Sequence, residues 1–203
     1  LQRSITLFDE ALELAPRFAE AHAWRSAALS ALGNVGMLEP RVSAERARRA
    51  ADRAIAIDDT LAAGFEMRGV IELYFDWNFE AAMRSFDKSI ERDQQSSNAH
   101  HLRGNALAFT GHFDLALRDI ERALRLDPTS LITLTDAGYV HYLAGRPETA
   151  MARLEAALAQ NPHFVHARQK LIWVLVAMGD TTAALEQLER VSMFLGTDRL
   201  GER

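Results

Sequence analysis

A repeat of 34 residues runs through the second half of this sequence and constrains its fold more than any other feature. The segment from Ser97 to Ser130 is followed directly by a segment of equal length, Leu131 to Phe164, with the same plan. Four marks recur at the same offset: Gly104 as Gly138, Ala116 as Ala150, Ala123 as Ala157 and Pro128 as Pro162. A fixed period of this length indicates a stacked-repeat protein, in which each unit buries its apolar faces against its neighbours.

Each unit is predicted to contain two amphipathic helices separated by a short turn. In the segment 97–130, small and apolar residues fall at helical spacing on both sides of Gly111. Gly111 suits the left-handed conformation that ends many helices. Pro128 follows the second helix, at a point where a helix cannot readily continue. The unit is therefore expected to fold as helix, turn, helix.

Small residues occupy the positions where two helices have to touch. We expect Gly104 of the first helix to face Ala116 of the second, and Ala123 to face the first helix of the next unit. Side chains of this size permit a close approach of two helix axes. A large residue at the glycine position would overpack the interface and destabilise the unit.

The marks of the unit resemble those of the tetratricopeptide repeat (TPR) family. The residues that carry the resemblance are Gly104, Gly111, Phe113, Ala116, Ala123, Leu124 and Pro128. The resemblance implies an all-α fold: a right-handed α-α superhelix of about five helix pairs, preceded by an orphan helix. It also implies a concave groove lined by the first helix of each pair.

The same register divides the whole chain into a single array. It predicts an orphan helix in residues 1–16, repeats at 19–61, 62–96, 97–130, 131–164 and 165–195, and a polar tail at 196–203. In the repeat at 62–96, Gly69 and Ala82 hold the mark positions. Because the chain starts inside a helical pattern, we expect it to be a piece of a longer protein.

The repeat at 19–61 has about nine extra residues, placed at 34–42. Two interpretations are open for this insertion. It can be a lengthened loop, since loops tolerate extra residues, or a loop that binds a partner, since loops often carry function. Pro40 could open the second helix of this repeat one or two turns early, because proline is tolerated at the first helical position.

Composition argues against several functions. A net charge of −5 disfavours nucleic-acid binding, and the absence of cysteine excludes disulfides and thiolate chemistry. No apolar run approaches the ~18 residues of a membrane span. His163 and His166 are three residues apart, but no further metal ligand follows at suitable spacing. With no nucleophile motif or phosphate-binding loop either, the sequence predicts a protein that is not an enzyme and holds no metal or cofactor.

The groove is the best candidate for binding. Its predicted lining residues are Trp24, Met67, Tyr74, His101, Asn105, Phe109, Asp136, Tyr139, Tyr142, Lys170 and Trp173. Aromatic side chains with a few polar groups suit peptide capture, because they offer apolar area at a small loss of conformational entropy. The alternative for each aromatic residue is simple packing between neighbouring helices.

Some TPR proteins hold the C-terminal carboxylate of heat-shock chaperones in a clamp of lysine, asparagine and arginine side chains. The matching positions here are His101, Asn105, Asp136, His166 and Lys170, of which only Asn105 is retained. Asp136 would place a carboxylate beside the bound carboxylate, and like charges repel. We therefore do not expect a clamp of this type.

A second resemblance is to TPR regions of bacterial regulators that carry a winged-helix or nucleotide-cyclase domain. It extends over roughly 19–179 and includes the segments YFDWNFEAA and HHLRGNALAFTGHFDLAL. It implies a cytoplasmic interaction or sensory region. We thus expect a non-catalytic module that binds a peptide or helix of a protein partner. The alternatives are a small-molecule sensor and an oligomerisation arm that self-associates through an uncapped C-terminal helix.

Overall fold

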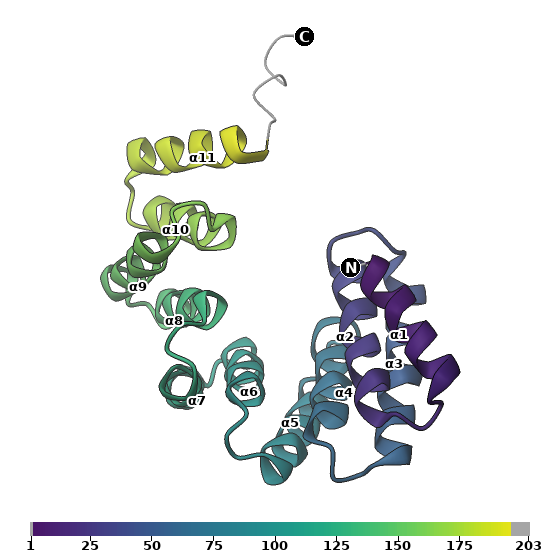
Figure 1. Cartoon of the computed structure of the whole chain (residues 1–203). Helices are drawn as coiled ribbons and strands as arrows, with labels where there is room; N and C mark the ends of the chain where they lie inside the picture. Colours follow the sequence, from purple (N-terminus) through teal and green to yellow (C-terminus); the bar gives the residue numbers. More distant parts are fainter. Residues whose placement is uncertain (1, 196–203) are drawn as a thin grey trace. The chain divides into compact units, whose positions relative to one another are not determined.

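The computed structural model describes residues 2–195, and this part of the chain is built entirely of helices, eleven in number (Figure 1). The predicted all-α architecture is therefore confirmed. The predicted polar tail at 196–203 lies outside the described residues. Within the described range, no helix is both long enough and apolar enough to cross a membrane.

The chain divides into two compact units, residues 1–106 and 107–203. Unit 1 holds α1 (Gln2–Leu14), α2 (Ala19–Asn34), α3 (Pro40–Ile57), α4 (Ala62–Tyr74), α5 (Phe79–Arg92) and most of α6 (Ser97–Phe109). Unit 2 holds the end of α6, α7 (Phe113–Leu126), α8 (Leu131–Leu143), α9 (Pro147–Gln160), α10 (Val165–Ala177) and α11 (Thr181–Leu195).

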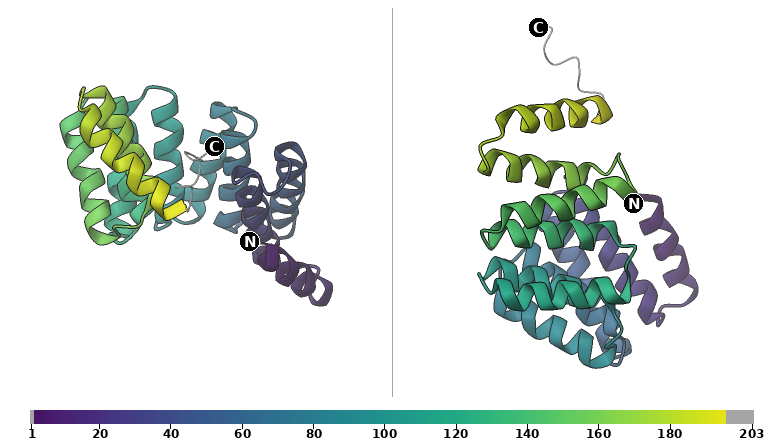
Figure 2. Two further views of the ribbon diagram at one scale, coloured as in Figure 1. Left: turned by 90° about the horizontal axis from the view of Figure 1, so that it is seen from above. Right: turned by 90° about the vertical axis from the view of Figure 1, so that its left-hand side faces the viewer.

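Helices that follow one another pack as antiparallel neighbours. In unit 1, α2 packs on α3 and α4 on α5; in unit 2, α8 packs on α9 and α10 on α11. Pairs then stack through α3 and α4 in unit 1 and through α9 and α10 in unit 2. The helices of unit 2 lie one above another in the right-hand view of Figure 2. Each pair alone leaves an apolar face bare, and its neighbour covers that face.

The turn inside each helix pair contains one residue with left-handed backbone. Gly111, Gly145 and Gly179 have φ values of 80°, 71° and 82°, as the sequence predicts for a glycine that ends a helix. Gly36 has a φ of 70° in the turn between α2 and α3. The turn between α4 and α5 is different, because Trp77 takes this conformation there, with a φ of 54°.

The glycine marks inside the first helices permit close contact with the second helices. A Cβ built on Gly138 would lie 2.8 Å from Leu154 Cγ and 3.2 Å from the Ala150 carbonyl oxygen. A Cβ built on Gly69 would lie 2.5 Å from the Phe86 ring. Both partners are completely buried. A side chain at either glycine would thus displace the opposite helix or its side chains.

The extra residues of the repeat at 19–61 lengthen its two helices more than its loop. Helices α2 and α3 contain 16 and 18 residues, against 13 and 14 in α4 and α5. The loop between them is short, residues 35–39, and α3 begins at Pro40. The interpretation of the insertion as a lengthened loop is corrected accordingly. The alanine- and arginine-rich sequence after Pro40 favours helix, which is why the extra residues join it.

Unit 1 carries an ion pair that recurs between successive repeats. An arginine on a first helix binds an aspartate 16 residues earlier, on the preceding second helix, in three places: Arg25 to Asp9 at 2.6 Å, Arg68 to Asp52 at 2.5 Å and Arg103 to Asp87 at 2.7 Å. We call these three pairs the arginine ladder. All three are partly exposed to solvent.

Candidate functional site

Side chains on one face of α8 and α10 form a cluster in unit 2. Tyr139 and Tyr142 are three residues apart on α8, and Lys170 and Trp173 are three apart on α10. Residues at this spacing lie on the same face of a helix. Since α8 and α10 are in contact, the two sets meet. We call Tyr139, Tyr142, Lys170 and Trp173 the aromatic platform.

The Lys170 ammonium lies over two rings of the aromatic platform. Its Nζ atom is 3.7 Å from the ring centroid of Tyr139 and 4.5 Å from that of Trp173. The Tyr139 ring is 5.7 Å from the Trp173 ring and stacks on Tyr142 at 6.1 Å, centroid to centroid. These distances suit cation–π and aromatic pair interactions. Trp173 is still 48% exposed, so the platform presents apolar surface to solvent.

Partial burial changes the acid–base properties of the platform. Removal from water lowers the pKa of Lys170, and the Asp136 carboxylate partly offsets this shift. Burial likewise raises the pKa of Tyr139, and Tyr142 and Asp136 add to the increase. Among the described residues, Lys170 forms no ion pair with a carboxylate. Its ammonium therefore keeps hydrogen-bond donors for a group from outside the chain.

Asp136 and His166 form a polar pair on the same two helices. His166 Nε2 lies 3.5 Å from Asp136 Oδ1, and the Asp136 side chain is the less exposed of the two, at 13% against 38%. His166 is absent from the predicted lining residues, although the sequence places it at one position of the carboxylate clamp. Its spacing of four residues from Lys170 was the signal that places it on the platform side of α10.

The predicted polar residues of unit 1 belong to a buried hydrogen-bond network. His101 and Asn105 are one helical turn apart on α6 and are 5% and 8% exposed. Asn105 Nδ2 lies 3.2 Å from His101 Nε2 and donates to the Tyr74 hydroxyl at 3.4 Å. Buried polar groups require such partners. These side chains are therefore engaged inside the unit, unlike those of the aromatic platform.

Glu66 is a second buried polar group of unit 1. It accepts hydrogen bonds from the Ser96 hydroxyl, at 3.2 Å, and from the Asn98 side-chain amide. Burial raises the pKa of the Glu66 carboxyl, and the hydrogen bonds from Asn98 and Ser96 partly offset this increase. Glu66 is 5% exposed, so its carboxyl group lies in the interior of unit 1 and not on a binding surface.

Three other predicted groove residues lie in different surroundings. Trp24 on α2 is 49% exposed and Phe109 at the end of α6 is 43% exposed, so both are accessible to a partner. Met67 on α4 is 4% exposed and packs in the hydrophobic core with Leu29 and Ile71. Met67 is therefore a core residue and offers no binding surface.

The predicted lining residues are shared between the two units. Those of unit 1 are Trp24, Met67, Tyr74, His101 and Asn105, and those of unit 2 are Phe109, Asp136, Tyr139, Tyr142, Lys170 and Trp173. Within unit 2 the structure brings together the four platform residues and the neighbouring Asp136. Across residues 2–195, no group of three or more histidine or acidic side chains is placed to hold a metal ion.

Two sequence-family models match the chain, and both are described as tetratricopeptide repeat. One covers residues 97–130 and the other residues 141–199. A search of curated proteins finds Superkiller protein 3 of Schizosaccharomyces pombe, 30% identical over 120 residues. The match covers 59% of this chain and 8% of the relative, so the chain spans less than a tenth of that protein's length.

Solved structures with the same fold include several TPR proteins. TTC0263 of Thermus thermophilus, a thermophilic TPR protein, is 20% identical, with 85% of this chain and 89% of that chain covered and a TM-score of 0.70. PilW, a type IV pilus biogenesis factor, is 18% identical over 95% and 84% of the two chains, with a TM-score of 0.74. YrrB, described as a TPR protein with an unusual peptide-binding site, is 19% identical over 95% and 94%, with a TM-score of 0.58. At these identities the likeness concerns the fold.

Proposed function

Because this chain is a tetratricopeptide-repeat domain, we propose that it is a non-catalytic interaction module that binds a peptide segment of a protein partner on the aromatic platform. The observation that carries the proposal is the position of Lys170. Its ammonium lies over the rings of Tyr139 and Trp173 and is partly withdrawn from water, and the nearby Asp136 carboxylate favours its charged form.

The chemistry of the platform suits a peptide with both apolar and hydrogen-bonding groups. Trp173 and Tyr142 can cover an apolar side chain, and aromatic residues are typical of the energetically dominant positions in protein interfaces. The Lys170 ammonium can donate to a backbone carbonyl of the same peptide. YrrB, which has a similar fold, is described as having a peptide-binding site, and this supports the proposal by analogy.

The proposal is tested by affinity capture of partners from a cell lysate with wild-type protein and with the double variant Tyr139→Ala, Trp173→Ala. Recovered proteins are identified by mass spectrometry, and synthetic peptides that tile each partner are titrated against both proteins. We expect one peptide to bind the double variant at least tenfold more weakly, which corresponds to about 1.4 kcal/mol.

Trp24→Ala is the matched control, because Trp24 lies in the other unit and is exposed almost to the same extent as Trp173, 49% against 48%. It should leave the affinity of the peptide unchanged. Circular dichroism confirms that all variants are folded. Equal affinity of wild type and double variant for every peptide recovered would disprove platform binding.

A second candidate function is self-association through α11. Leu188 is 48% exposed, whereas the residues at the same repeat position, Leu154, Ile120 and Phe86, are completely buried. Leu185, on the same helix, is 60% exposed. If α11 mediates self-association, light scattering will show a mass that rises with concentration, and Leu185→Glu, Leu188→Glu will abolish that rise. A constant monomer mass would exclude it.

The cellular context of the module follows from the sequence resemblance alone. We infer a cytoplasmic regulatory protein of bacterial type, in which the TPR region receives a partner and another domain supplies the output. Fractionation of cells that produce the full-length protein tests the location directly. Recovery of the protein outside the cytoplasm would contradict this inference.

A further inference from the structure

Trp77 occupies a position that holds glycine in the later repeats. It precedes Phe79 by two residues, as Gly111 precedes Phe113, and it shares the left-handed backbone of that glycine. Left-handed backbone is unfavourable for a bulky residue. Trp77 is also 70% exposed, so burial does not compensate for the strain. Such an outlier at the surface points to a role in binding.

The backbone on both sides of Trp77 is held in place. Asp76 accepts hydrogen bonds from Arg48 of α3 at 2.7 and 2.8 Å. Asn78 caps α5 by accepting from the backbone N–H of Ala81 at 3.1 Å. The Trp77 ring meets the Phe79 ring edge to face at 6.2 Å. The exposed indole is therefore presented in a defined position.

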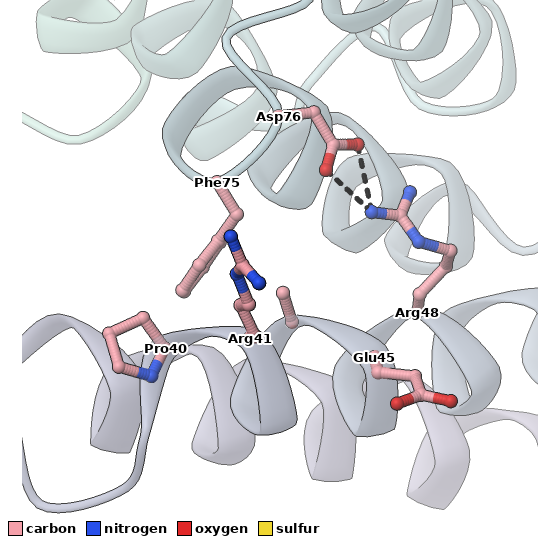
Figure 3. Close-up of a pocket in the computed structure, with 7 residues that line it drawn as sticks. Pro40, Arg41, Glu45, Arg48, Phe75 and Asp76 are labelled. Atoms are coloured by element: carbon pink, nitrogen blue, oxygen red, sulfur yellow. Dashed lines mark hydrogen bonds and ion pairs between the residues drawn. The ribbon is translucent and has the colours of Figure 1, made fainter.

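A pocket of about 290 Å³ lies beside this turn, between α3 and the end of α4. Its lining residues are Pro40, Arg41, Ala44, Glu45, Arg48, Phe75 and Asp76. Figure 3 shows the Phe75 ring and the Arg41 side chain extending toward each other across the pocket. Trp77 does not line the cavity but directly follows Asp76, which does. We call this cavity, together with the adjacent Trp77, the Trp77 pocket. It exists because α3 begins early, at Pro40, in the lengthened repeat.

The charges of the Trp77 pocket leave one cation available. Arg48 is matched by Asp76, and Glu45 is matched by Arg49. Arg41 is exposed and forms no ion pair within the part of the chain that the structure describes. It lies close enough to Glu39 to lower the pKa of that carboxyl, after the larger effect of backbone hydrogen bonds.

The first turn of α3 does not supply a further anion site. The Glu39 carboxylate already accepts from the backbone N–H groups of Arg41 and Val42, at 3.1 and 2.8 Å. An anion at the Trp77 pocket would consequently be held by the Arg41 guanidinium. The same end of the repeat carries further exposed apolar side chains, since Met37 is 69% and Val35 is 60% exposed.

We propose that the Trp77 pocket is a second docking site, for a partner peptide in which an apolar side chain stands next to an acidic one. The apolar side chain would pack against Phe75, Ala44 and the Trp77 indole. The acidic side chain would pair with Arg41, whose charge is complementary. This site lies in unit 1 and uses no residue of the aromatic platform, so it does not depend on the proposed function.

The test is a selection of short random peptides, displayed on phage, on protein whose platform is disabled by Lys170→Ala, Trp173→Ala. We expect enriched peptides to contain an apolar residue beside aspartate or glutamate. In the same background, Trp77→Gly and Arg41→Glu should each weaken binding of these peptides by at least about tenfold. Arg46→Glu is the matched control, an exposed arginine of α3 that does not line the pocket, and should leave the affinity unchanged.

Trp77→Gly also keeps the test independent of folding. It restores the residue type found at this position in later repeats, so its melting temperature should not fall below that of the parent protein. The proposal is overturned if no peptides are enriched, if the enriched peptides lack acidic residues, or if they bind the Trp77→Gly protein as well as its parent.

Discussion

The two units place different chemistry at the same position of the repeat. Asn105, Tyr139 and Trp173 are separated by 34 residues each and lie at equivalent points of α6, α8 and α10. Asn105 is 8% exposed and interacts with His101 inside unit 1, whereas Trp173 is 48% exposed at the surface of unit 2. The same repeat position is thus buried in unit 1, at Asn105, and half exposed in unit 2, at Trp173.

The difference follows from what each side chain requires. A buried amide is stable only when its hydrogen bonds are satisfied, so Asn105 is tied to neighbouring polar groups. Trp173 has only one polar group, the indole N–H, and it can remain half exposed while its ring packs on Lys170. The register of the repeat determines the position of a side chain. The chemical type of the side chain determines whether it stabilises the fold or is available to a partner.

The largest expected effect tests whether the two units share the same helix packing. Gly69→Ala places a Cβ against the completely buried ring of Phe86, and we expect a loss of about 2 kcal/mol in the free energy of unfolding. Gly138→Ala meets Leu154 at 2.8 Å, a less severe overlap than the 2.5 Å at Gly69, so we expect a smaller loss. The better helix propensity of alanine, about 1 kcal/mol, applies equally to both variants. Urea denaturation of both variants measures the difference, and equal losses would contradict this account of the packing.

The next effect separates stability from binding at the shared position. Asn105→Ala removes a partner of buried His101 and should lower the free energy of unfolding by about 1–1.5 kcal/mol. Trp173→Ala removes a half-exposed ring and should lower it by only about 0.5–1 kcal/mol, while it weakens binding of the platform peptide. Denaturation and peptide titration of both variants check this. A larger stability loss for Trp173→Ala would reverse the comparison.

A smaller effect concerns the buried carboxyl of unit 1. The folded-state pKa of Glu66 is raised above its ordinary value, so the protonated carboxyl stabilises the fold at acidic pH. That contribution is complete below the pKa of the unfolded chain and is lost as the pH rises through the raised folded pKa. Relative to Glu66→Gln, the wild type should therefore gain stability on acidification over this range.

Melting curves as a function of pH measure the Glu66 effect. Glu80→Gln is the matched control, because the Glu80 side chain is 87% exposed and its replacement should leave the pH dependence of unit 1 unchanged. If Glu66→Gln shows the same pH dependence as the wild type, the carboxyl is not the titrating group.

The smallest stability effect is expected at the platform. The pKa of Lys170 is lowered by desolvation, so its charged form is disfavoured in the folded state and stability recovers as the pH rises through the folded pKa. Lys170→Met, which keeps the packing on the rings, should raise the melting temperature at neutral pH by no more than about 2 °C. The same variant should bind the platform peptide more weakly, and a lower melting temperature would contradict the prediction.

The sequence predicted the helices and their turns because those depend on local patterns. Gly111 and Gly145 mark the ends of helices through their left-handed backbone, and Gly138 marks a close contact between helices. Both signals recur at a fixed period and are visible without coordinates. Tyr139 and Trp173 occupy the same repeat position, which is why both are among the predicted groove residues, but the contact between their rings was not predicted.

Two other features, the burial of Met67 and the conformation of Trp77, could not be predicted from the repeat period alone. Met67 has the spacing of a groove residue, but it packs in the core with Leu29 and Ala47. The equivalent residue of the next repeat, Leu102, is likewise buried. Trp77 was hidden because one extra residue shifts the register of its turn. Alignment on Phe79 and Phe113 reveals that it replaces a glycine.

The arginine ladder has a consequence for the order in which repeats assemble. Each step offers the same arginine and the same aspartate at the same separation, so a mispaired stack that skips one repeat, or borrows one from another molecule, would satisfy the same charges. Partly exposed pairs also contribute little energy each. Correct order during folding must therefore come from unlike shapes between neighbouring repeats, such as Ile55 of α3 against Gly64 of α4. Repeats that are made more alike in sequence should misassemble more often.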